Sequence, residues 1–183
     1  MRRLVVLAAI LGLVTVPLAL ATSTATDPND VKGKLDLKKL VAARDRQLMR
    51  VTITTYDRWA ARILRGPGGP RQGRNRLTVL YDIGVNDRVA DYRGRVVYSG
   101  GRLRLWISGN GSNYEPLPVT RPSRLSVTWT QPIDIFFHGP PAGPRRVYLA
   151  VKSLYRRKGT ACAKGCRDRI PNKGWIVVAF HLP

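Results

Sequence analysis

An alternating run of residues around a glycine pair constrains the fold more than any other part of the sequence. The stretch DYRGRVVYSGGRLRLWIS, residues 91–108, places Gly100 and Gly101 between two arms in which apolar and polar side chains alternate. Alternation with a period of two is typical of half-buried strands, and a glycine pair suits a tight two-residue hairpin turn. The stretch therefore predicts an antiparallel β-hairpin.

The two-residue turn also predicts the register of this hairpin. With Ser99 opposite Arg102, one face carries the pairs Tyr98–Leu103, Val96–Leu105 and Gly94–Ile107. The other face carries Val97–Arg104, Arg95–Trp106 and Arg93–Ser108. A slip of one residue would bury the arginines, so this register is strongly favoured.

Similar strand patterns recur along the chain and predict an all-β fold. The clearest are residues 48–56, 76–84, 124–131, 145–155 and 174–183. The last is apolar on both faces, which predicts a central strand. Tyr56, Trp59, Ala60 and Ile63 have helical spacing instead, so a short helix or turn is expected near 56–64. About eight strands with frequent turn signals favour an antiparallel β-sandwich or jelly roll.

The first 25 residues have the features of a secretory signal peptide. Arg2 and Arg3 precede an apolar run from Leu4 to Leu20, and Ala19-Leu20-Ala21 forms a small-x-small cleavage motif. The alternative is an uncleaved membrane anchor, for which this run is about the minimum length. Residues 26–183 are expected to form one secreted domain, with no membrane span after cleavage.

The two cysteines predict a local disulfide. Cys162 and Cys166 lie four positions apart, and an exported chain meets oxidising conditions. So small a loop contributes only about 2 kcal/mol through chain entropy. Zinc is the weaker alternative, because the chain has only two histidines and both lie far from the pair.

The formal net charge of +21 is the strongest compositional signal of a partner. Such a field attracts polyanions, including nucleic acid, anionic cell-wall polymers and acidic polysaccharides. The residues expected to serve a polyanion are Arg145, Arg146, Arg156–Lys158 and the loop Arg65–Arg76. Arginine far outnumbers lysine, however, and a GC-rich coding bias would produce the same excess with no ligand.

Two stretches hold clustered aspartates in this basic chain. The first contains Asp27, Asp30 and Asp36, and the second contains Asp82, Asp87 and Asp91. Calcium binds six to eight oxygens, usually from carboxylates and loop carbonyls. Aspartate is also common in turns, where its side chain bonds the local backbone. Both interpretations remain open, because the spacing does not match an EF-hand loop.

These stretches also resemble a known type of exported domain. DPNDVKGKLDLKKLVA, residues 27–42, resembles the opening of exported bacterial β-sandwich proteins, including family 9 carbohydrate-binding modules and DOMON-type domains. LYDIGVNDRVADYRG, residues 80–94, resembles their acidic turn, and CRDRIPNKGW, residues 166–175, resembles the end of uncharacterised secreted proteins with this layout. The resemblance implies a jelly-roll-like sandwich that binds a sugar or haem, with Asp30, Asp36, Asp82 and Asp91 as calcium-binding or turn-forming carboxylates. Haem is not expected, because no Met/His pair is suitably spaced.

Trp106 is the residue whose predicted position is most informative. Alternation places it on the polar face of the hairpin, opposite Arg95 and near Arg93 and Arg104. A tryptophan among arginines can stack a sugar ring, form a cation–π pair with Arg95, or be covered by a loop. Arg93, Arg95, Arg104 and Trp106 are therefore the candidate ligand-binding residues. Trp129 and Trp175 are expected in the core.

No local sequence motif indicates catalysis. The chain lacks G-x-S-x-G, H-E-x-x-H and comparable signatures, and its one glutamate lies in a predicted loop. We therefore expect a secreted, non-catalytic binding or structural module of the cell envelope, binding carbohydrate and stabilised by calcium. The alternatives are an electrostatic polyanion binder and a hydrolase that uses His138.

Overall fold

The protein is an all-β molecule, as the sequence predicts. The computed structural model describes residues 22–181 apart from 68, 85–89, 110 and 138–143. A single 3-10 turn, η1 (Ala61–Leu64), occupies the stretch expected to form a short helix or turn. The strands are β1 (Thr22–Thr26), β2 (Leu37–Asp45), β3 (Leu48–Thr55), β4 (Arg76–Asp82), β5 (Tyr92–Ser99), β6 (Arg102–Gly109), β7 (Ser112–Asn113), β8 (Leu117–Pro118), β9 (Thr120–Ser123), β10 (Ser126–Pro132), β11 (Pro144–Tyr155), β12 (Cys166–Ile170) and β13 (Ile176–His181).

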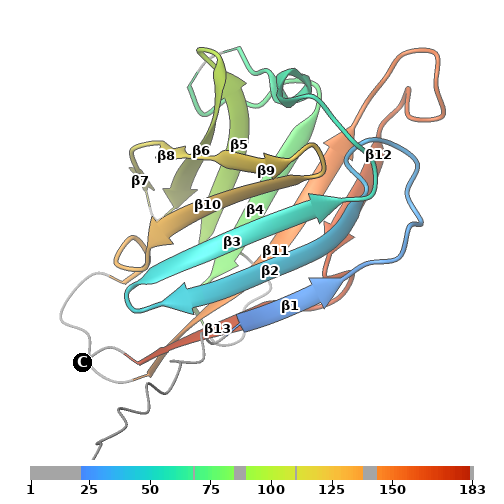
Figure 1. The fold of residues 1–183 in the computed structure, drawn as a ribbon. Coiled ribbons are helices and arrows are strands. Elements are labelled where there is room, and N and C mark those ends of the chain that lie inside the picture. Colours follow the sequence, from blue (N-terminus) through green and yellow to red (C-terminus); the bar gives the residue numbers. More distant parts are fainter. Residues whose placement is uncertain (1–21, 68, 85–89, 110, 138–143, 182–183) are drawn as a thin grey trace, which may run out of the picture.

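The strands form two antiparallel sheets that pack face to face as a β-sandwich. The small sheet has the order β1-β2-β3-β10-β9. The large sheet has the order β12-β11-β4-β5-β6-β7, with β13 also paired to β11 and β8 to β6. In Figure 1 the small sheet lies in front of the large one. The predicted sandwich architecture is therefore confirmed.

The core lies between the two sheets and includes a polar connection. Leu40, Val51 and Leu149 are among the fully buried side chains that fill the interior. Tyr81 Oη and Trp129 Nε1 both donate to Gln131 Oε1, each at 2.8 Å. The shared acceptor thus satisfies one donor from each sheet, Tyr81 on β4 and Trp129 on β10. Either donor would cost stability if it were buried without a partner.

The hairpin around the glycine pair has the predicted register. β5 pairs with β6 from Tyr92–Gly109 to Ser99–Arg102, through Arg95–Trp106. Gly100 and Gly101 have φ angles of 54° and 79°, the left-handed pair that a type I′ turn requires. The apolar face of the hairpin is buried, so the predicted inner face is correct.

The strands differ from the prediction in several places, since about eight were expected and thirteen are described. Alternation does not reveal β2, because a β-bulge between Leu37 and Lys39 interrupts it and leaves Lys38 and Lys39 consecutively exposed. β13 is not a central strand, since it pairs with β11 alone and exposes Val177. Trp175 precedes β13 and is half-buried beneath the guanidinium of Arg169, outside the core.

The first described strand, β1, begins at the residue that follows the predicted cleavage motif. β1 pairs with β2 along its whole length, from Thr22–Ala43 to Thr26–Lys39. The predicted boundary at residue 25 therefore falls inside a strand, whereas cleavage after Ala21 would keep β1 whole. Within the described ranges, none of the helical structure is long and apolar enough to span a bilayer.

Candidate metal site

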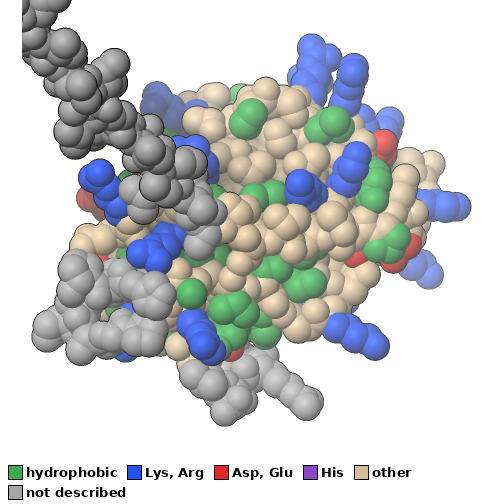
Figure 2. Space-filling model, turned by 60° about the horizontal axis from the view of Figure 1, so that its bottom comes forward, with side chains coloured by type: hydrophobic (Ala, Val, Ile, Leu, Met, Phe, Trp, Pro, Cys, Tyr) green, Lys and Arg blue, Asp and Glu red, His purple; other side chains and the backbone are tan. Residues whose placement is uncertain are grey.

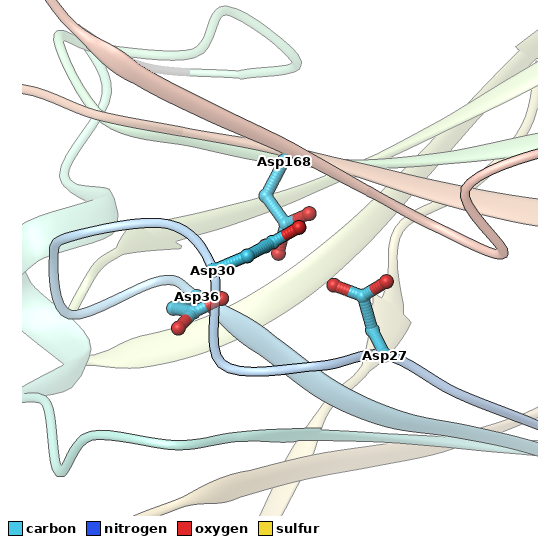
Figure 3. Close-up of side chains that lie close together, drawn as sticks. All are labelled: Asp27, Asp30, Asp36 and Asp168. Carbon is cyan, nitrogen blue, oxygen red and sulfur yellow. The ribbon is translucent and has the colours of Figure 1, made fainter.

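Four aspartate side chains converge at the edge where the two sheets meet. Asp27 follows β1, Asp36 precedes β2, Asp30 lies between them, and Asp168 is the middle residue of β12. One carboxylate oxygen from each lies within 4.8 Å of the others. Figure 3 shows Asp168 approaching from β12 and the other three from the segment that joins β1 to β2. We call these four residues the aspartate cluster and residues 27–36 the strap.

Hydrogen bonds fix both ends of the strap. Asp27 donates its backbone N–H to the Lys38 carbonyl at 3.1 Å, and Tyr56 Oη donates to the Asp27 carbonyl at 2.6 Å. At the other end, Tyr56 N–H donates to the Asp36 carbonyl at 3.0 Å. The Leu37 N–H donates to Asp168 Oδ2 at 2.6 Å, which ties the strap to β12. The strap is therefore held by both sheets.

The predicted disulfide supports the middle of the strap. Cys162 and Cys166 are bonded, and the Lys32 carbonyl oxygen lies 2.7 Å from Cys162 Sγ. Gly33 has a φ of 125°, and a Cβ built there would lie 2.6 Å from Tyr155 Cδ1 and 3.1 Å from Cys162 Sγ. The strap follows its path here because residue 33 has no side chain.

Gly33→Ala is expected to destabilise the protein by about 1–3 kcal/mol, because it adds both backbone strain and a clash with Tyr155. It should also weaken metal binding, since the strap carries three of the four carboxylates. Gly159→Ala is the matched control: Gly159 has a φ of 75°, but a Cβ there meets nothing within 4 Å. Chemical denaturation of both variants tests this, and equal losses would contradict the proposed packing of Gly33.

Two members of the cluster are buried without partners. Asp27 and Asp36 are 4% and 2% exposed, and no partner of their four carboxylate oxygens meets hydrogen-bond geometry, although the Asn172 side chain acts on Asp27. Burial, with the nearby charges of Asp168 and Asp30, raises the pKa of Asp27 to about 6, an effect that the Asn172 side chain opposes. Burial and Asp168 raise the pKa of Asp36 to about 7. Asp168, in contrast, accepts N–H bonds from Leu37 and Arg169.

The cluster has the chemistry of a site for a hard divalent cation. All four candidate ligands are carboxylates, the groups that calcium and magnesium prefer. Oxygens on opposite sides of one calcium ion lie about 5 Å apart, against about 4 Å for magnesium. A set of oxygens within 4.8 Å of one another fits around one calcium ion. The open side of the cluster, at exposed Asp30, would leave room for water or a ligand.

The structure brings together half of the predicted calcium ligands. Asp30 and Asp36 belong to the cluster, together with Asp27 of the same acidic stretch. Asp82 is the last residue of β4 and accepts the Gly84 N–H at 2.8 Å, and Asp91 precedes β5 and accepts the Ile83 N–H at 2.8 Å. Asp82 and Asp91 therefore bond the backbone of a turn, which was the alternative to calcium binding. Asp168 was missed, although its inward position between Cys166 and Ile170 is a signal that strand alternation offers.

The predicted ligand patch lies on the outer face of the large sheet. Arg93 is exposed, Arg104 and Trp106 are half-buried, and Arg95 donates to Ser108 Oγ at 2.9 Å. This face is partly covered, because Gly66, in the loop between η1 and β4, packs on Val97. Val97 is fully buried. The four side chains are therefore not one open platform. His138, the alternative catalytic residue, lies outside the described residues.

Basic side chains are widespread on the molecule. Figure 2 shows Lys and Arg side chains projecting from much of one face, with few Asp or Glu side chains beside them. The residues expected to serve a polyanion are dispersed in sequence and structure: Arg145 and Arg146 lie on β11, whereas Arg156–Lys158 follow it. Arg145 also lies over the Phe137 ring, 5.4 Å from its centroid.

Comparison of the chain with protein-family models, curated proteins and solved structures finds no match. The resemblance to family 9 carbohydrate-binding modules and DOMON-type domains stays a prediction based on short motifs.

Proposed function

We propose that the protein is a secreted, non-catalytic β-sandwich module of the cell envelope that binds calcium at Asp27, Asp30, Asp36 and Asp168. The observation that carries this proposal is the burial of the Asp27 and Asp36 carboxylates, whose four oxygens have no hydrogen-bond partner. Burying unpaired charges is costly, and proteins compensate for it with a counter-charge or a metal ion. No Lys or Arg is among the groups that shift the pKa of these two carboxylates.

The proposed ion would act first on stability. It would neutralise repulsion among four carboxylates and join the strap of the small sheet to β12 of the large sheet. Extracellular calcium modules bind with dissociation constants of roughly 10⁻⁴ to 10⁻³ M, which suits the secreted location we propose. The ion has no assigned part in catalysis.

Calcium is expected to raise the melting temperature of the metal-stripped protein. A concentration of about 100 times Kd adds about 2.7 kcal/mol, which corresponds to roughly 5–10 °C for a domain of this size. Differential scanning calorimetry with and without calcium measures the shift, and isothermal titration measures the stoichiometry. Magnesium is the control and should give a smaller shift. An unchanged melting temperature in saturating calcium would refute the proposed site.

A ligand face on the large sheet is the second part of the proposal. The large sheet presents exposed Arg93 and Lys152 on its outer surface, where a glycan or another polyanion would bind. This second part concerns the ligand, whereas the aspartate cluster concerns the stability of the module.

A further inference from the structure

A hollow of about 1010 Å³ joins the aspartate cluster to the outer face of the large sheet. Its lining includes Asp30 and Asp168 of the aspartate cluster together with Arg76, Arg93 and Lys152. Arg167 and Arg169 also line it. Arg167 and Arg169 share one face of edge strand β12, and Asp30 of the strap also lines the hollow, so the hollow reaches from that face to the strap.

The basic end of the hollow is built by strand register. Lys152 on β11 lies between Arg169 on β12 and Thr78 on β4, and Leu154 lies between Arg167 and Arg76 in the next row. These side chains are therefore neighbours on one face, although they come from three strands. Leu80 and Leu154 add half-buried apolar surface between the charges.

Most of these cations are available to a ligand. Arg76, Arg93, Lys152 and Arg167 are exposed, and none of them forms an ion pair within the described ranges. Arg169 differs: it donates to the carbonyls of Pro171 and Gly174 and stacks on Trp175, so it shapes the hollow. The hollow thus offers four exposed positive charges beside a candidate calcium site, of which Arg76 also donates to the Gly73 carbonyl at 3.4 Å.

We infer that this hollow binds an acidic polysaccharide through calcium and arginine together. The inference rests on the proposed calcium site. One carboxylate of the polymer would complete the coordination of the ion beside Asp30 and Asp168, and further acidic groups would pair with Arg76, Arg93, Lys152 and Arg167. Without the ion, Asp30 and Asp168 repel the same carboxylate, so binding depends on calcium.

The lining favours a sugar polymer over a nucleic acid. Single-stranded nucleic acids bind along a series of aromatic side chains on which successive bases stack. The hollow has one tryptophan, Trp175, and the Arg169 guanidinium lies 5.7 Å from its ring centroid. Sugar rings need only apolar patches such as Leu80 and Leu154 between charged contacts.

The test is fluorescence anisotropy of a labelled uronic-acid oligosaccharide, a short hyaluronan fragment, with the full exported protein in calcium and after chelation. Binding is expected in calcium and should weaken at least about tenfold after chelation. The double variant Arg93→Ser/Lys152→Ser should also bind about tenfold more weakly, while its calcium-dependent rise in melting temperature stays intact. Arg50→Ser is the matched control, since Arg50 is an exposed arginine on the small sheet, and it should bind as the wild type does.

The outcomes separate the two proposals. If calcium raises the melting temperature but the fragment does not bind, or the double variant binds it normally, the hollow is not its site and the calcium site stands. If calcium leaves the melting temperature unchanged, the calcium site and the calcium-dependent binding both fail. Tighter binding of a single-stranded oligodeoxynucleotide than of the hyaluronan fragment would overturn the choice of a polysaccharide.

Discussion

Asp36→Asn is expected to melt at a higher temperature than the wild type after metal removal, and to lose most of the calcium-dependent increase. The amide keeps the shape of the side chain but removes a buried charge that repels Asp168, Asp30 and Asp27. The pKa of Asp36 is raised to about 7, so at about pH 8 the ionised carboxylate costs up to about 4 kcal/mol. Thermal melting at that pH, with calcium and after chelation, measures both effects.

A higher melting temperature without metal, together with a smaller calcium-dependent increase, distinguishes a metal ligand from an ordinary structural aspartate. Asp45→Asn is the control, because Asp45 is an exposed carboxylate at the end of β2 outside the cluster. It should leave both melting temperatures nearly unchanged. If Asp36→Asn destabilised the metal-free protein and kept the calcium increment, Asp36 would be a structural hydrogen-bonding residue rather than a calcium ligand.

The metal-free protein is expected to lose stability as the pH rises from about 4 to about 7. Asp27 and Asp36 have pKa values of about 6 and about 7, against 3.8 for the model carboxyl group. Over this range the folded state binds more protons than the unfolded state, so raising the pH favours unfolding. Their contribution is fully present below about pH 4 and is lost as the pH passes their raised pKa values. The shifts of the two groups together give an expected loss of about 6 kcal/mol between about pH 4 and about pH 7.

Denaturation in urea across this pH range measures the effect on protein stripped of metal. Saturating calcium should flatten the profile, because an ion stabilises the ionised carboxylates. The double variant Asp27→Asn/Asp36→Asn should show the flat profile without calcium. A metal-free wild type that gained stability between pH 4 and 7 would show that these two carboxylates are compensated by the protein itself.

Local rules accounted for the parts of the fold that depend on neighbouring residues. The β5–β6 hairpin followed because a two-residue turn fixes the register and alternation fixes the buried face. Alternation did not reveal β2, because its bulge exposes Lys38 and Lys39 consecutively and hides the period of two. β13 was placed wrongly because apolar residues such as Val177 occur on both of its faces, and hydrophobicity alone does not reveal how many neighbours a strand has.

The candidate site was only partly predictable, because local patterns reveal residues that are close in sequence but not their distant partners. Asp30 and Asp36 stood out because they share one acidic stretch. Their partner Asp168 is distant in sequence, and only the pairing of β12 with β11 brings it to them. Asp82 and Asp91 had the same local appearance as Asp30 and Asp36, but the structure gives them backbone N–H groups to accept.

The position of the strap also determines how the chain is cross-linked. The disulfide closes a loop with a sequence separation of four, so it restrains one turn. The strap and β12 meet across a separation of 131, near the two ends of the domain. In a chain-entropy model, closing the longer loop restricts the unfolded chain by about 3 kcal/mol more than closing the shorter one. The permanent covalent bond is thus local, while the closure that encircles nearly the whole domain would depend on a link that dilution of an ion can undo.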